Sequence, residues 1–123
     1  FNALENVCIP AFIAKISKAK AEKKAKDLLG YLGLANRMTH KPSELSGGEK
    51  QRVAMARALV NSPGVVMADE PSGNLDSNNR NELHELLFRL RDEMGQTFII
   101  VTHDDNFAER SDKILHIKDG VIE

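Results

Sequence analysis

The stretch that indicates most about the fold is Leu45-Ser46-Gly47-Gly48-Glu49-Lys50-Gln51-Arg52. Ser46 is a good helix N-cap, and apolar residues follow it at helical spacing, so a helix is expected to begin there. Gly47 and Gly48 carry no Cβ, so their N–H groups can approach a ligand closely. A helix N-terminus with free amides can bind a phosphate group. An ordinary capped helix after a glycine turn explains the two glycines as well, and for them alone it is the favoured interpretation.

Length and composition are those of one globular domain with a core of its own. The chain has 123 residues, of which 41% are hydrophobic and 28% charged. Its single cysteine, Cys8, excludes an internal disulfide and fits a reducing compartment. The longest apolar run, residues 7–14, is interrupted by Pro10 and is too short to span a bilayer. Because the chain begins at Phe1 rather than Met, we expect it to be a fragment of a longer protein.

The charge distribution is uneven, although the net charge is only −1. Residues 1–41 are basic and the remainder is acidic, which raises the question of a nucleic-acid or anionic-lipid partner. Six lysines of the basic part crowd into one predicted helical segment between Lys15 and Lys26. A solvated helix face explains such a cluster, so no nucleic-acid partner is expected.

Helices are predicted throughout the first half of the chain. Residues 3–16 read as a largely apolar helix, and Pro10 should start, end or kink a helix. Ser17 can cap a second helix that runs to about Leu32 and is closed by Gly33. Residues 34–44 read as a loop or short turn, and the helix capped by Ser46 is expected to end near Asn61. Residues 1–62 are therefore predicted to form a helical part.

The second half changes to an alternation of strands and helices. The apolar runs at residues 65–68 and 97–102 are typical of buried parallel strands, and residues 113–117 are predicted as a third strand. Helices are expected at residues 78–94, ended by Gly95, and at residues 104–110. This order favours an α/β fold with a parallel sheet over residues 63–123.

Charged side chains directly follow the two central strands, at the sheet edge where ligands of parallel α/β proteins gather. Asp69 and Glu70 follow the first strand, and His103 follows the second. Successive side chains of an extended chain point to opposite sides, and Pro71 favours an extended Glu70. One carboxylate could therefore hold a magnesium-bound water while the other faces an attacking water.

Each of these features also has an ordinary explanation. Acidic residues after a strand are commonly solvent-facing loop residues, and a lone histidine there is commonly a surface or capping residue. The string Ser72-Gly73-Asn74-Leu75-Asp76 is typical of a turn followed by a helix N-cap. Taken singly these explanations are adequate, but they do not explain why all the strings occur in one chain.

The order and spacing of four strings resemble the second half of ABC-type ATPases. The strings are residues 45–48, 65–71, 73–76 and 102–104. The resemblance covers essentially the whole chain, and the four strings are highly specific in combination. It implies the C-terminal part of a P-loop NTPase fold, with a helical subdomain over residues 1–62 and an α/β core over residues 63–123.

The resemblance also implies roles for individual residues. Asp69 matches the Walker B aspartate, which supports Mg²⁺ through water, and Glu70 matches the catalytic general base. His103 matches the switch histidine that contacts the γ-phosphate of ATP. The other matching residues lie where two ATPase subunits meet: Ser46, Gly47, Gly48 and Glu49 in the signature, which binds nucleotide held by the partner subunit, and Leu75 and Asp76 in the D-loop.

Within this family, residues 68–76 resemble the branch that serves lipoprotein release, macrolide export and a cell-division transporter-like complex. The flanking residues 3–7, 42–49 and 56–61 are most similar to the lipoprotein-releasing ATPases. The resemblance implies ATP and Mg²⁺ as cofactors, a second ATPase subunit and inner-membrane permease subunits as partners, and a lipoprotein substrate reached indirectly. It implies a location on the cytoplasmic face of the bacterial inner membrane.

The chain contains no Gly-Lys-Ser or Gly-Lys-Thr, the end of the P-loop that cradles nucleotide phosphates. In the family, the Q-loop glutamine and the aromatic residue that stacks on adenine also lie upstream of the matching region. We therefore expect this polypeptide alone to bind ATP poorly and not to hydrolyse it. The sheet should lack its P-loop strand, and its open apolar edge should favour self-association.

Two other classes of protein remain as alternatives. DNA-repair and chromosome-maintenance ATPases share the signature and Walker B strings, but they place long coiled coils before the signature, where residues 1–44 hold two short helices. A non-enzymatic helical binding module fits the missing phosphate cradle, but it leaves four hydrolytic strings unexplained. A fragment of an ATPase accounts for more of the sequence.

Overall fold

The computed structural model describes all residues from Phe1 to Glu123. Five α-helices, two short 3₁₀ helices and four strands follow one another along the chain. Their bounds are α1 (Ala3–Ile13), α2 (Lys18–Tyr31), η1 (Ala35–Arg37), η2 (Pro42–Glu44), α3 (Gly47–Leu59), β1 (Val65–Asp69), α4 (Ser77–Met94), β2 (Thr97–Val101), α5 (Asp105–Glu109), β3 (Ile117–Lys118) and β4 (Val121–Ile122).

Local sequence signals explain most of the helix boundaries. Ser17 caps α2 and Ser46 caps α3, each by accepting a hydrogen bond from a first-turn N–H group, as predicted. Gly33 follows α2 with a φ of +78°, a left-handed conformation that glycine adopts without cost. The first helix is shorter than expected and ends at Ile13, because Lys15 takes a φ of +63° and breaks the helical path.

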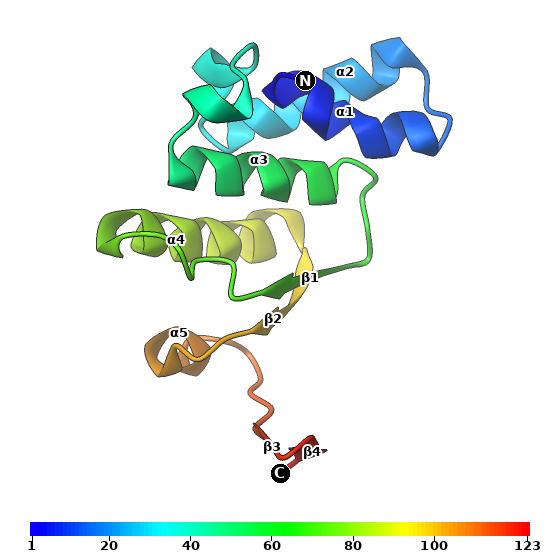
Figure 1. Cartoon of the computed structure of the whole chain (residues 1–123). Coiled ribbons are helices and arrows are strands. Elements are labelled where there is room, and N and C mark those ends of the chain that lie inside the picture. Colours follow the sequence, from blue (N-terminus) through cyan, green and yellow to red (C-terminus); the bar gives the residue numbers. More distant parts are fainter.

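Helices α1 to α4 form layers on one side of a small sheet. Figure 1 shows α1 and α2 above α3, α3 above α4, and α4 above β1 and β2. One buried cluster runs from Ala3 and Val7 through Leu29 and Leu59 to Phe107, so residues of both predicted parts share a single core. Packing of α3 on α4 fixes the helical part against the strands that carry the candidate site.

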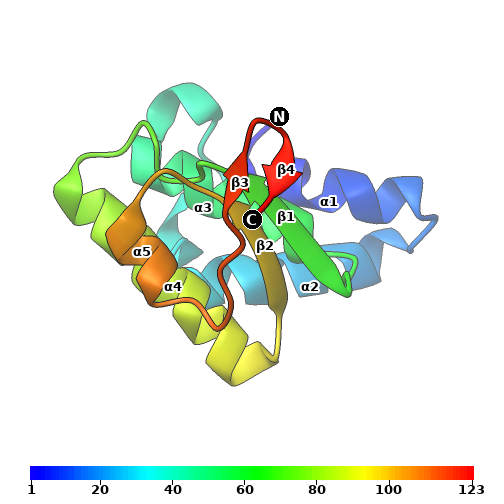
Figure 2. The same ribbon diagram turned by 90° about the horizontal axis from the view of Figure 1, so that it is seen from below.

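The central strands β1 and β2 pair in parallel, with α4 as the connection between them. Figure 2 shows them side by side from below. Their predicted burial on both faces is wrong. Val66 is buried under the helices, whereas Met67 is 75% and Ile99 51% exposed on the other face. Strand side chains alternate, and no element of this chain covers the second face.

The third parallel strand predicted at residues 113–117 is also wrong. Residues 113–116 are not in a strand, and Ile117–Lys118 pair with Val121–Ile122 as an antiparallel hairpin. Asp119 and Gly120 both have positive φ angles, the conformation that two-residue hairpin turns require. This turn pairs the segment with its own continuation, away from the central sheet, and Figure 1 shows the hairpin far below the helices.

Candidate functional site

The chain turns sharply where β1 ends. The Glu70 N–H donates to the Val101 carbonyl at 2.7 Å, and the Gly73 N–H donates back to the Glu70 carbonyl at 3.0 Å. Glu70 has a φ of +45°, so the prediction that Pro71 keeps it extended is wrong. A glutamate in the left-handed region is strained, and the surrounding hydrogen bonds must hold it there.

The Glu70 carboxylate reaches across to the turn that follows β2. One of its oxygens accepts a hydrogen bond from the His103 N–H, and the other accepts one from the Thr102 hydroxyl at 3.4 Å. The His103 imidazole Nε2 lies 3.9 Å from the same carboxylate, and the His103 side chain is 96% exposed. The structure therefore brings together Glu70 and His103, the two residues for which the sequence suggests catalytic roles.

Asp69 lies at the same edge, at the last position of β1. Its carboxylate is exposed and makes no hydrogen bond or ion pair. No group of three or more His, Cys, Asp or Glu side chains is arranged to hold a metal ion by itself. A single free carboxylate fits Mg²⁺, which keeps several waters and takes its remaining ligands from substrate phosphates.

The N-terminus of α3 carries a reciprocal capping arrangement. The Glu49 N–H donates to Ser46 Oγ at 3.2 Å, and the Ser46 N–H donates to Glu49 Oε1 at 2.9 Å. The N–H groups of Gly47 and Gly48, at the first two helical positions, have no hydrogen-bond partner. This end of α3 therefore offers two free amides in a place suited to an anion.

Arg37 is a member of this arrangement that the sequence did not reveal. Its Nε lies 2.9 Å from Glu49 Oε2. The hydrogen bond from the Ser46 N–H, together with the Arg37 guanidinium, lowers the pKa of Glu49 below its ordinary value. Arg37 belongs to no recognisable string, and the structure shows it at the end of η1, in contact with Glu49 in the first turn of α3. It offsets a carboxylate charge that would repel an anionic ligand.

The signature glycines contact the region predicted as a D-loop. A Cβ on Gly48 would lie 2.7 Å from Asn79 Oδ1, and a Cβ on Gly47 would lie 3.4 Å from a methyl group of Leu75. Asp76 caps α4 by accepting a hydrogen bond from the Asn79 N–H at 2.9 Å. The predicted residues therefore form two groups: Ser46 to Glu49 with Leu75 and Asp76, and Asp69 with Glu70 and His103. No hydrogen bond joins one group to the other.

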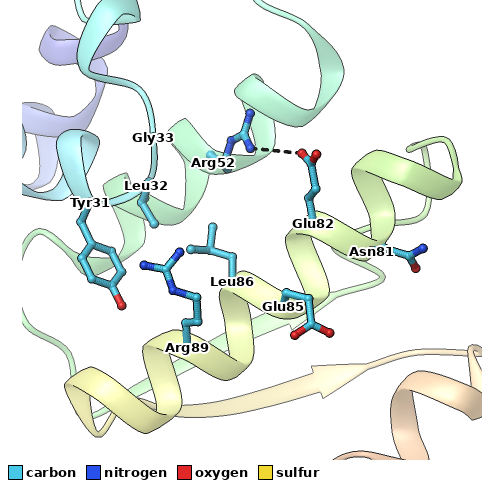
Figure 3. A pocket seen from close by; sticks show the side chains of 9 residues that line it. All are labelled: Tyr31, Leu32, Gly33, Arg52, Asn81, Glu82, Glu85, Leu86 and Arg89. Atoms are coloured by element: carbon cyan, nitrogen blue, oxygen red, sulfur yellow. Dashed lines mark ion pairs between the residues drawn. The ribbon is translucent and has the colours of Figure 1, made fainter.

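A cavity of about 440 Å³ lies away from both groups, between the end of α2, α3 and α4. Figure 3 shows Arg52 and Arg89 among acidic side chains there, with Arg52 paired to Glu82 at 3.6 Å. None of the residues predicted to act on nucleotide lines this cavity. Its mixed charges belong to the contact between the helical layer and α4.

Comparison with known proteins shows the family to which the chain is similar. The model of one family, the ABC transporter family, matches residues 2–73. The chain is 58% identical over 122 residues to a protein of Bacteroides thetaiotaomicron described as the lipoprotein-releasing system ATP-binding protein LolD, covering 99% of this chain and 56% of that protein. It is 61% identical to the protein of the same description from Porphyromonas gingivalis, with the same coverage.

Solved structures give the same result at the level of the fold. The dimeric structure of MJ0796, a bacterial ABC transporter cassette, superposes with a TM-score of 0.81 and 42% identity. A dimeric post-hydrolysis state of MJ0796 bound to ADP and Pi gives a TM-score of 0.81 at 41% identity. In both cases all of this chain and 55% of the other chain are covered. The chain thus spans about half the length of the proteins it matches, and its architecture is that of the C-terminal part of an ABC ATPase.

Proposed function

Because this chain belongs to the ABC transporter family, we propose that it supplies the hydrolytic and signature elements of an ATPase subunit. The observation that carries the proposal is the position of Glu70. Its carboxylate stands at the end of β1 and is held by the turn that presents His103 at the end of β2. Strand ends of a parallel sheet are where such proteins bind their ligands.

Each residue of the site has a role in the proposed reaction. Glu70 orients an attacking water and accepts its proton, and the exposed His103 imidazole contacts the terminal phosphate. Asp69 holds Mg²⁺ through water, and the metal neutralises phosphate charge when it is bound. The free amides of Gly47 and Gly48, with the Ser46 hydroxyl, bind phosphate presented by a second subunit.

The proposed assembly is a homodimer in which each site combines elements of both subunits. Leu75 and Asp76 lie beside the signature glycines, so both would be at the contact between subunits. Glu49 has a supporting role, because its carboxylate is already bonded to Ser46 and Arg37. The name of the matched MJ0796 structure describes a dimer, which supports this arrangement.

We further propose that the full-length subunit powers lipoprotein release from the inner membrane, working with permease subunits on the cytoplasmic face. Support comes from the relatives described as lipoprotein-releasing system ATP-binding proteins. No helix of the structure has the length and hydropathy needed to cross a membrane. Macrolide export and the cell-division-type role are the alternatives within the same branch.

The role of Glu70 is tested in the full-length subunit by the substitution Glu70→Gln. Loss of the proton acceptor should reduce kcat for ATP hydrolysis by about 100-fold or more, while the Kd for Mg-ATP stays within about 2-fold. Glu109→Gln on α5, an exposed glutamate without an ion pair or side-chain hydrogen bond, is the matched control and should keep full activity. Retained turnover in Glu70→Gln would remove Glu70 from this role.

The transport role requires a separate experiment. The subunit is reconstituted with its permease in vesicles loaded with an acylated lipoprotein, and ATP-dependent release is measured. Release by the wild-type complex and none by Glu70→Gln is expected. Hydrolysis that is stimulated by a macrolide, without release of lipoprotein, would support the export alternative instead.

A further inference from the structure

Two polar side chains are buried near the candidate site, and the proposed reaction uses neither. They are Ser72, 7% exposed in the turn after Glu70, and His84, 6% exposed on α4. Ser72 Oγ and His84 Nε2 lie 2.9 Å apart and are hydrogen-bonded. Buried polar groups are costly unless they are paired, so each of these residues satisfies the other.

The face of the His84 ring contacts the helix that follows β2. The His84 ring stacks on Phe107 of α5 with centroids 3.8 Å apart and an angle of 8° between the rings. Phe107 also meets the edge of Phe88 of α4, at 5.6 Å. An ion pair of 2.7 Å between Arg110 and Glu85 further joins α5 to α4. His84 thus lies between the turn after β1 and the helix after β2.

A chain of hydrogen bonds leads from Phe107 back to the catalytic candidates. The Phe107 N–H donates to Asp104 Oδ1 at 3.0 Å, and the Asp104 N–H donates to Thr102 Oγ1 at 3.0 Å. Thr102 Oγ1 donates in turn to the Glu70 carboxylate. Since Ser72 is two residues after Glu70, the contacts form a closed ring through Glu70, Ser72, His84, Phe107, Asp104 and Thr102.

We propose that His84 is a positioning residue for the hydrolytic site: through Ser72 and Phe107 it fixes the turn that carries Glu70 against the turn that carries His103. The inference rests on the function proposed above. Helix α4 is the longest element of the chain, with 18 residues, and provides a rigid base for the His84 side chain.

The strained backbone of Glu70 explains why such a device is needed. A residue with a φ of +45° keeps that conformation only where its surroundings determine it from several directions. The carboxylate is held on the side of β2, and the Gly73 N–H bond to the Glu70 carbonyl closes the turn on itself. The Ser72–His84 hydrogen bond adds the contact that fixes this turn to α4. A relaxed turn would move the proton acceptor away from the attacking water, and displacements of this kind are costly in rate.

The test uses two single variants of the full-length subunit, their double variant and a control. Ser72→Ala removes the hydroxyl, and His84→Phe keeps a ring against Phe107 but removes the hydrogen bond. Each should lower kcat for ATP hydrolysis about 10-fold with KM for ATP within about 2-fold. If both act through one hydrogen bond, the double variant should also lose about 10-fold rather than about 100-fold. Ser43→Ala, at an exposed serine whose side chain makes no hydrogen bond, should match the wild type.

Three outcomes would overturn the inference: an unchanged kcat in Ser72→Ala, multiplicative losses in the double variant, or a rise in KM without a change in kcat. A second measurement does not depend on hydrolysis. In NMR spectra of the full-length subunit, Ser72→Ala should shift the amide signals of Glu70 and His103, and Ser43→Ala should not. Unshifted signals refute the positioning role, whereas a wild-type subunit that does not hydrolyse ATP refutes the proposed function instead.

Discussion

Glu49 occupies the third position of α3, where its carboxylate meets two donors at once. It accepts a hydrogen bond from the Ser46 N–H and forms an ion pair with Arg37, and its side chain is only 19% exposed. These contacts shape the loop whose free amides are proposed to bind phosphate. The side chain of Glu49 therefore stabilises the backbone at the start of α3.

Two substitutions of Glu49 distinguish the contribution of the cap from that of the ion pair with Arg37. Glutamine can complete the capping arrangement, so Glu49→Gln should change the free energy of unfolding by less than about 0.5 kcal/mol. Glu49→Ala loses the cap and the ion pair and should cost about 1 kcal/mol. Urea denaturation of the full-length subunit measures both values, with Glu109→Ala as the control for an exposed glutamate. Equal destabilisation by Gln and Ala would show that the charge, and not the cap, is what matters.

The buried imidazole of His84 predicts a pH dependence of stability. Burial lowers the pKa of His84 from its ordinary value of 6.5, and Asp104, Arg80, Arg110 and Glu85 are the charged groups around it. The unfolded chain therefore binds a proton at a higher pH than the folded chain does. This part of the stability is complete above pH 6.5 and is lost as the pH falls through the folded pKa.

Comparison with His84→Phe isolates this component, because the other histidines are present in both proteins. Urea denaturation between about pH 5 and 8, a range around the ordinary histidine pKa of about 6.5, measures the free energy of unfolding of the full-length subunit and of the variant. The difference between the two free energies of unfolding should be constant at the upper end of the range. Towards the lower end the wild type should lose stability relative to the variant, because only its unfolded chain gains a proton at His84. Parallel curves would mean that the His84 pKa is not lowered.

At the scale of elements, the contact between α3 and α4 determines which glycines can be replaced. Gly48 faces Asn79 so closely that a Cβ would lie 2.7 Å from its side-chain oxygen. Asn79 is itself bonded to the α4 N-cap Asp76. The glycine is therefore required for the close approach of two helix N-termini.

Substitution of two helical glycines by alanine should change stability in opposite directions. Gly48→Ala must displace Asn79 and should destabilise the full-length subunit by about 1–2 kcal/mol, as overpacking does. Gly30→Ala in α2 is the matched control: nothing lies within 4 Å of its added Cβ, and it should stabilise by about 0.5–1 kcal/mol. Thermal denaturation gives the sign of each change. A stable Gly48→Ala protein would show that Asn79 moves aside freely.

In the molecule as a whole, helices α1 to α4 lie on one side of β1 and β2 (Figure 1). The other face exposes Met67 at 75%, Val101 at 55% and Ile99 at 51%. An apolar face on a sheet with open edges invites pairing with another chain. The 123 residues also lack a phosphate cradle, so poor ATP binding by this polypeptide alone stays a prediction.

The exposed sheet face predicts self-association of the isolated 123-residue polypeptide. Light scattering at increasing concentration should give a mass above 13.6 kDa. Ile99→Lys should reduce the association, because it places a charge in the centre of the apolar face. Ile13→Lys, at an exposed isoleucine of α1 remote from the sheet (77% exposed), should have no effect. A clean monomer at all concentrations would contradict the prediction.

Much of the fold could be predicted because its signals lie close together in the chain. Ser17, Ser46 and Gly33 define helix ends through hydrogen bonds or angles within a few residues of themselves. The apolar run at residues 65–68 indicates a strand by itself. Burial of its second face and the pairing of residues 113–117 could not be predicted, because both depend on which other elements are present to cover or pair with them.

Local sequence was enough to predict most of the helices, the caps at Ser17 and Ser46 and the two central strands, since periodicity and capping are local properties. The way in which the site is held is visible only in the folded chain. It depends on the positive φ of Glu70, its hydrogen bond to His103 across 33 positions, the ion pair of Arg37 with Glu49 and the Ser72–His84 hydrogen bond. These contacts join residues far apart in sequence. For the turns that carry Glu70, Ser72 and His103, the contacts depend on the packing of α4 between the strands and α3 (Figure 1).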